Sequence, residues 1–174
     1  MPDPEPHDRL LAFGNQLMEV HILLRDELAD LRDNVDAYFA GRGGPPRDLR
    51  THCLAFCAGL RRHHTGEDQE AFPEILTHFP ELHGLIVQLR TDHNRIEWTM
   101  HNLEKLLQEL PDEPSPADAT RFRAELDSMT AIMETHFRYE EKKLRSVLDS
   151  LDIPRWRTDP PAFLRYTFPD DALE

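Results

Sequence analysis

The stretch that decides the fold is residues 49–73, LRTHCLAFCAGLRRHHTGEDQEAFP. Its apolar residues recur in alternating steps of three and four, the period of a helix that buries one face. The last two turns place a histidine and a carboxylate on that face, and the whole stripe reads Leu49, Cys53, Phe56, Leu60, His63, Glu67, Ala71. We expect this helix to end near Pro73, or Phe72 and Pro73 to begin a further short turn, since proline suits a first helical position.

Prolines mark where the other helices can lie. The chain has 14 of them, and proline is excluded from helix interiors. The long proline-free windows are residues 7–44, 47–72, 81–110 and 117–153. We therefore predict an all-α protein, an up-down-up-down four-helix bundle over residues 1–153. The loop 111–118 supplies a turn and N-cap residues for the last helix.

A proline-rich tail, residues 154–174, follows the predicted bundle. It contains four aromatic residues, too many for a solvated segment, which are Trp156, Phe163, Tyr166 and Phe168. We expect this tail to pack on the bundle.

The other three windows carry similar stripes, and each has a histidine where the pattern asks for an apolar residue. The first runs Leu10, Phe13, Leu17, His21, Leu24, Leu28, Leu31, Val35, Tyr38. The third runs Leu82, Leu85, Leu89, His93, Ile96, Met100, Leu103, Leu107, Leu110, and the fourth runs Phe122, Leu126, Met129, Met133, His136, Glu140, Leu144, Val147, Leu151. Polar residues thus interrupt the expected core in all four helices.

Composition bounds the class of protein. The 174 residues include 33 acidic and 20 basic side chains, for a net charge of −13, which argues against nucleic acid or an anionic membrane as partner. No apolar run approaches the roughly 18 residues of a membrane span, and the N-terminus lacks a signal-peptide pattern, so we expect a cytoplasmic protein. Cys53 and Cys57, on adjacent helical turns, are expected to be free core thiols.

The polar residues on the stripes indicate a bound cation. Burying carboxylates costs several kcal/mol each unless they are paired or coordinated, and the stripes have no Lys or Arg near them. At about 1.5 Å of rise per residue, helices joined at the predicted loops bring the four histidines to one level. A cation at that level would compensate the buried carboxylates.

The spacing of these residues predicts the kind of cation. The pattern His-x3-Glu puts both side chains on one helical face, and it occurs at His63/Glu67, His93/Glu97 and His136/Glu140. Imidazole and carboxylate ligands in a bundle core suit iron, with manganese or zinc as substitutes. The predicted ligands are too many for one ion and suit two, and they are His21, His63, Glu67, His93, Glu97, His136 and Glu140.

These motifs resemble the hemerythrin-like (HHE cation-binding) domains. The resemblance covers residues 10–150 and rests on His21, on His63-His64-x2-Glu67-Asp68 followed by Phe72-Pro73, on His93, and on His136 with Glu140-Glu141. It implies a four-helix bundle that holds an oxo- or hydroxo-bridged pair of irons. The implied small ligand is dioxygen, peroxide or nitric oxide.

The third helix departs from the oxygen-carrying members of that family. They have His-x3-His there and five histidines in all, whereas this chain has His93-x3-Glu97, with His101 one turn further. A centre richer in carboxylate stabilises ferric iron, so sensing or redox chemistry is favoured over reversible oxygen carriage. The family's spacing on the fourth helix would select Glu141, but the stripe favours Glu140. His64 and Asp68 lie about 100° round the helix from the ligands and are expected to be solvated or to support the ligands from outside.

Three functions remain open. The first is a di-iron protein that binds or reacts with a small oxidant at the predicted centre. The second is a module that stores or senses iron without turnover and acts through a protein partner. The third is a metal-free helical interaction domain in which the stripe histidines are only hydrogen-bonded.

Overall fold

The computed structural model describes residues 12–42 and 46–165, and this part of the chain is helical with no strand. The elements in chain order are α2 (Phe13–Phe39), α3 (Pro46–Gly66), the π-helix η1 (Glu67–Ala71), α4 (Phe72–His78), the 3-10 turn η2 (Pro80–Leu82), α5 (His83–Glu109), α6 (Pro116–Ser150), α7 (Pro154–Thr158) and the 3-10 turn η3 (Ala162–Leu164). The predicted all-α class is confirmed. None of the described helices has the length and apolar character that a membrane crossing requires.

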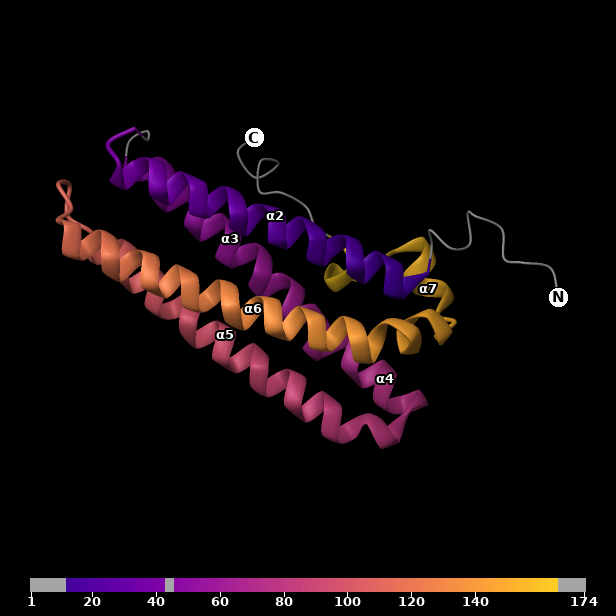
Figure 1. Cartoon of the computed structure of the whole chain (residues 1–174). Helices are drawn as coiled ribbons and strands as arrows, with labels where there is room; N and C mark the ends of the chain where they lie inside the picture. The colour runs from indigo at the N-terminus through magenta and orange to yellow at the C-terminus, as the bar shows by residue number, and fades with distance from the viewer. Residues whose placement is uncertain (1–11, 43–45, 166–174) are drawn as a thin grey trace.

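The four long helices α2, α3, α5 and α6 lie side by side and form the body of the molecule (Figure 1). Helix α2 contacts α3 and α6, and α5 contacts the same two helices, so the four enclose a common interior. Consecutive long helices run in opposite directions (Figure 1). This arrangement brings the inward faces of all four together.

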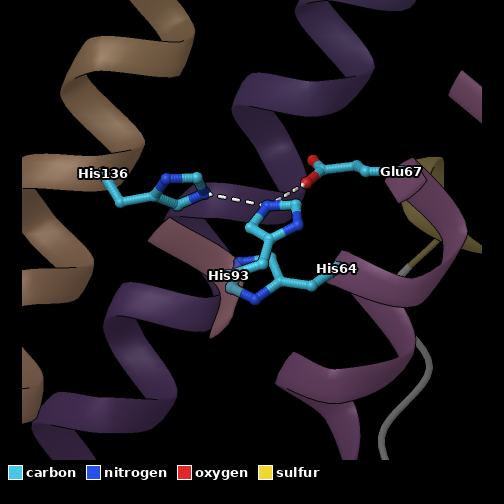
Figure 2. A group of neighbouring side chains, drawn as sticks. All are labelled: His64, Glu67, His93 and His136. Atoms are coloured by element: carbon cyan, nitrogen blue, oxygen red, sulfur yellow. Dashed lines mark hydrogen bonds and ion pairs between the residues drawn. The ribbon is translucent and has the colours of Figure 1, made fainter. Parts of the chain in front are cut away.

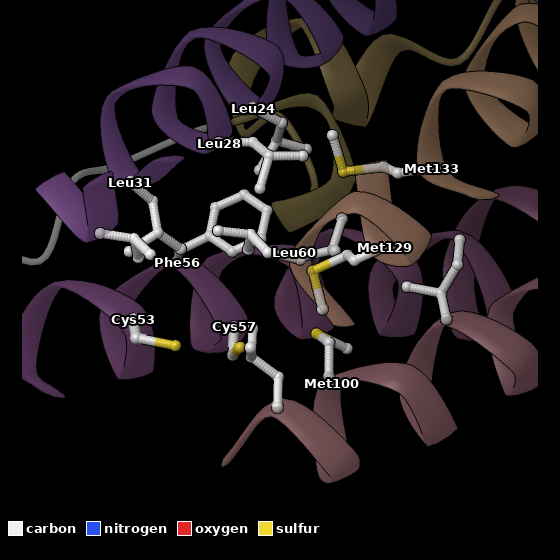
Figure 3. Packing of buried hydrophobic residues seen from close by; sticks show 14 of the residues in the cluster. Leu24, Leu28, Leu31, Cys53, Phe56, Cys57, Leu60, Met100, Met129 and Met133 are labelled. Carbon is white, nitrogen blue, oxygen red and sulfur yellow. The ribbon is translucent and has the colours of Figure 1, made fainter. Parts of the chain in front are cut away.

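The interior consists of two apolar clusters. One contains Leu24, Leu60, Ile96 and Met133, and Figure 3 shows its packing around Phe56. Cys53 and Cys57 belong to this cluster as fully buried free thiols, as predicted. The second cluster is built from residues nearer the opposite ends of the same helices, including Leu17, Ala71, Leu89 and Leu144. Helices α2, α5 and α6, and α3 with its continuation through η1 and α4, therefore run from one apolar cluster to the other, with the stripe histidines between the two.

Local sequence accounts for the helix ends. Gly41 follows α2 with φ of 72°, a left-handed conformation that glycine adopts without strain and that commonly ends a helix. Ser115 caps α6: its hydroxyl accepts from the Asp118 backbone N–H, while the Asp118 carboxylate accepts from the Ser115 N–H. The loop before α6 thus supplies its cap, as the sequence predicted.

The helix that begins at Pro46 does not end near Pro73. It widens into the π-helix Glu67–Ala71 and continues as α4, with Pro73 in the first turn. Proline is tolerated there because the N–H that it lacks is not needed in the first turn of an α-helix. The alternative of a further short turn from Phe72 is the one that the structure bears out.

The tail packs on the bundle as far as the structure describes it. Trp156 and Phe163 are buried, and α7 and η3 carry them. Tyr166, Phe168 and the stripe residue Leu10 lie outside the described residues.

Candidate metal centre

Seven side chains from the four long helices and the π-helix meet between the two apolar clusters. They form two groups that share Glu67, and within each group the potential ligand atoms lie within 4.8 Å of one another. The first group is His21, His63, Glu67 and Glu140, and the second is His64, Glu67, His93 and His136 (Figure 2). All seven are buried, with exposed fractions of 5% or less.

Glu67 connects the two groups through its two oxygens. Oε1 lies 2.9 Å from His63 Nε2, and Oε2 lies 3.1 Å from His93 Nε2. The residue lies at the start of the π-helix, one turn after His63, so both point inward from the same stretch of backbone. A carboxylate with one oxygen toward each group can bridge two ions.

Outer partners set the orientation of the stripe histidines. The Nδ1 atoms of His21 and His93 lie 2.9 Å from carboxylate oxygens of Glu141 and Asp68, and His63 Nδ1 lies 2.9 Å from the backbone oxygen of Phe163. Ionised carboxylates and carbonyls only accept hydrogen bonds, so each of these rings holds a proton on Nδ1. The Nε2 atoms then face the centre, the arrangement that metal-binding histidines adopt.

The Nε2 atoms meet in pairs. His21 Nε2 lies 3.1 Å from His63 Nε2, and His93 Nε2 lies 3.1 Å from His136 Nε2. Two ligands bonded to one ion at about 2.1 Å and at right angles lie about 3 Å apart. Two facing lone pairs at this distance repel unless a proton or a cation lies between them.

The pKa values of the side chains without an ion reflect this need for positive charge. Burial lowers the pKa of His93, but the hydrogen bond to Asp68 and the nearby Glu67 carboxylate outweigh burial and raise it to about 9. Burial and the nearby Glu67 carboxylate raise the pKa of Glu140 well above its ordinary value. Protons on His93 and Glu140 therefore take the place that a cation would fill.

Three histidines of the centre, His21, His64 and His136, are neutral. Burial is the main cause that lowers the pKa of His21 and of His136 to about 4, and it lowers the pKa of His64 well below the ordinary value. Neutral imidazole is the form that binds a metal.

Several buried polar atoms at the centre lack a hydrogen-bond partner among the described residues. They are His64 Nε2, both oxygens of Glu67, Glu140 Oε2 and His136 Nδ1. Orphaned buried polar atoms are rare in folded proteins and require an explanation. Bound cations would satisfy the inward-facing nitrogen and oxygen atoms, so the residues present fit a metal centre.

The expectation that Glu97 is a buried ligand is wrong. Its side chain is 51% exposed and accepts hydrogen bonds from Arg61 at 2.9 Å. The buried face of α5 runs through His93, Ile96 and Met100, which leaves Glu97 on the flank toward α3. A spacing of four residues from a buried histidine does not bury a carboxylate when an arginine of the neighbouring helix pairs with that carboxylate outside the core.

His64 was expected to be solvated or to support the ligands, but it lies in the second group. Its ring is 5% exposed and stacks on His93 with ring centroids 4.0 Å apart. Asp68 supports His93 from outside, as one of the two alternatives proposed. The sequence signal was the doublet His63-His64 itself, in a helix whose buried face is wide enough for both.

On α6 the structure favours Glu140, the choice of the stripe. Glu140 is 1% exposed, and its Oε2 lies 3.5 Å from Nε2 of both His21 and His136. Glu141 turns outward, where it contacts Nδ1 of His21 and pairs with Arg25 at 2.8 Å. His101 is exposed and does not join either group.

Fold and site together define a helical protein with a buried histidine–carboxylate centre suited to metal cations. A family model, the hemerythrin HHE cation-binding domain, matches residues 13–148, and the chain belongs to this family. Searches of curated proteins and of solved structures gave no match to the chain. The resemblance drawn from the sequence motifs is thus confirmed, and cation binding is the function that the family name carries.

Proposed function

We propose that the chain is a non-haem di-iron protein whose centre binds or reacts with a small oxidant: dioxygen, peroxide or nitric oxide. One observation carries the proposal: two buried groups of four potential ligands share a carboxylate, Glu67, whose oxygens have no hydrogen-bond partner among the described residues. Imidazole with carboxylate in a helical core suits iron, and manganese or zinc could occupy the same ligands.

The proposed ligands are five imidazoles and two carboxylates. They are His21, His63, Glu67 and Glu140 for one iron and His64, Glu67, His93 and His136 for the other. Each group offers four donors, fewer than the roughly six of an octahedral ion, which leaves positions for a small exogenous ligand. Bound iron would supply one-electron redox chemistry at these positions.

The corrected ligand set changes the expected chemistry. Without Glu97 and with His64, the centre has the five histidines that the oxygen-carrying members of the family are expected to have, one of them on α3 rather than α5. With five imidazoles and two carboxylates, the centre has no excess of carboxylate to favour ferric iron. Oxygen binding by the reduced centre becomes as well supported as oxidant turnover.

The protein's own residues prepare the site for such a ligand. The apolar clusters on either side exclude water from the ligand layer, and Glu141, Asp68 and the Phe163 carbonyl hold imidazoles in place. A surface cleft between α5 and α6 is lined by Asp92, Arg95 and His136 among others. This cleft offers a short path from solvent to the second group.

A matched pair of variants tests the proposed centre. Glu67→Gln keeps the size of the side chain but replaces one bridging oxygen with an amide group, so it should lower iron affinity by more than about 10-fold. Glu97→Gln, four residues after His93 but exposed, should retain iron as the wild type does. Metal analysis of both proteins measures the difference, and equal loss in both would contradict the assignment.

The reaction is tested on the reduced protein. Stopped-flow mixing of the reduced protein with dioxygen, peroxide or nitric oxide should change the iron absorption bands. Repeated turnover indicates an oxidant-consuming enzyme, and a stable adduct indicates a carrier or sensor. No spectral response to any of the three would contradict oxidant chemistry and leave iron storage as the function.

A further inference from the structure

The C-terminal strap, residues 151–165, lies beyond the stretch that matches the family model, which ends at residue 148. It nevertheless reaches the centre. The backbone oxygen of Phe163 lies 2.9 Å from Nδ1 of His63, and this contact is buried. The Nδ1 atoms of the other stripe histidines face carboxylates of the bundle itself, so His63 is the one stripe histidine whose Nδ1 contact comes from the strap.

Gly66 allows the strap to come this close. A Cβ built at residue 66 would lie 2.9 Å from the backbone nitrogen of Phe163 and 3.1 Å from its Cβ. The first distance is shorter than side chains tolerate, and the atom it meets belongs to backbone that cannot rotate away. Gly66 is three residues after His63, on the same side of the helix, so the contact and the gap that admits it form one feature.

Packing holds the strap in this position. Trp156 contacts Phe13 of α2 and Phe163 of η3 through edge-to-face rings with centroids 5.2 Å and 5.3 Å apart. Arg155 forms an ion pair with Glu74 of α4. The fully buried ring of Phe163 completes the anchor, so the position of its carbonyl is set by contacts with several elements.

We propose that the strap is a structural part of the metal centre and that Phe163 is a positioning residue for His63. Gly66 leaves the space that this close approach of Phe163 requires. Because a carbonyl only accepts, the contact keeps the proton of His63 on Nδ1 and presents the Nε2 lone pair to the first group. The inference rests on the proposed role of His63 as a metal ligand. It assigns a function to a segment that the family domain does not include.

Two full-length variants displace the carbonyl in different ways. Phe163→Ala removes the apolar anchor, and Gly66→Ala pushes the strap outward. Leu107→Ala, a buried core residue of the other apolar cluster, is the control for a general loss of stability. Circular dichroism establishes that each variant keeps its helical content, and Phe163→Leu, which retains an apolar anchor, should restore wild-type behaviour.

The first readout is the tautomer of His63 in the metal-free protein, from nitrogen-15 NMR of labelled histidine. The wild type and Leu107→Ala should show a proton held on Nδ1 of His63. In Phe163→Ala and Gly66→Ala the signal should move toward that of an imidazole exchanging between tautomers. This readout does not require iron, so it tests the contact even if the proposed function fails.

The second readout is the rate at which a chelator removes iron from the loaded protein. We expect both strap variants to release iron about 10-fold to 100-fold faster than the wild type, the usual effect of losing an outer partner of a metal-binding histidine. Leu107→Ala should stay close to wild type. Folded strap variants with an unchanged tautomer and a release rate within about twofold of wild type would overturn the proposal.

Discussion

His64 belongs to the second group of proposed ligands, and its contribution can be isolated from that of the surface histidines. His64→Ala should remove one imidazole from the second group only, so we expect iron occupancy to fall toward about one ion per chain. His101→Ala, an exposed histidine of α5, serves as the control and should retain the wild-type occupancy. Metal analysis at equal protein concentration compares the two, and full occupancy in His64→Ala would remove His64 from the ligand set.

The metal-free protein should lose stability as the pH falls from 6.5 toward 4. Burial lowers the pKa of His21 and His136 from 6.5 to about 4 and lowers that of His64 well below 6.5. The unfolded chain therefore takes up these protons first, while the raised pKa of Glu140 opposes the effect by one proton. The free energy of unfolding should fall by about 1.4 kcal/mol per pH unit for each net proton.

Urea unfolding at several pH values across this window measures the slope. His93 does not contribute there, because its pKa of about 9 lies above the ordinary value and both states are protonated below pH 6.5. A free energy of unfolding that stays constant or rises as the pH falls would contradict the burial of these neutral imidazoles.

The sequence predicted which turns of the helices would carry the centre, because a polar residue on an apolar stripe is visible as a break in the pattern. Six of the seven residues predicted as ligands meet in the structure, and Glu97 does not. What the pattern could not supply is the partner on the neighbouring helix: Arg61 holds Glu97 at the surface. The width of the buried face of α3, which admits His64 beside His63, is equally a property of packing.

The π-helix Glu67–Ala71 sets the register between the proposed ligands and α4. Wider helical turns of this kind insert one residue relative to an α-helix. Deleting the exposed Gln69 should restore α-helical register and turn His63 and Glu67 by about 100° relative to Phe72 and Ile75. The face with His63 and Glu67 and the face with Phe72 and Ile75 can then no longer be buried together. We therefore expect loss of iron and a lower melting temperature.

The control for this deletion is Gln69→Ala, which keeps the length of the segment. It should melt and bind iron as the wild type does. A deletion variant that retains both iron and the wild-type melting temperature would show that the π-helix has no part in forming the centre.

The positions of the helices could be predicted closely from the prolines and from the period of the apolar residues. The bounds of α5 and α6 lie within a few residues of the windows 81–110 and 117–153, because their ends depend on local signals such as the Ser115 cap. The continuation through Pro73 was left open by the sequence. Local preference cannot decide it, since whether the chain turns or continues depends on burying Phe72 and Ile75 against the bundle.

At the scale of the molecule, a polar layer divides one interior into two apolar clusters. Glu67 and Glu140 lie in that layer with exposed fractions of 1% each, so these two of the 33 acidic side chains do not contribute to the surface charge. Glu97, by contrast, remains a surface charge. The layer is the part of the core that is least stable without compensating positive charge.

Metal removal should therefore destabilise the whole bundle. A ligand that binds only the folded state stabilises it by about 2.7 kcal/mol at 100 times its dissociation constant. We expect the chelated protein to melt at a lower temperature than the iron-loaded protein, as measured by circular dichroism or calorimetry. Glu67→Gln provides the comparison, since its melting temperature should change little on chelation. Identical melting of loaded and chelated wild type would indicate that the layer holds no ion.

The central claim is that this layer is a centre for two irons, and the iron-to-protein ratio tests it most directly. Protein purified in air from iron-replete cells should contain about two irons per chain, and its spectrum should show near-ultraviolet absorption from an oxo-bridged ferric pair. Colourless protein without iron would contradict the account.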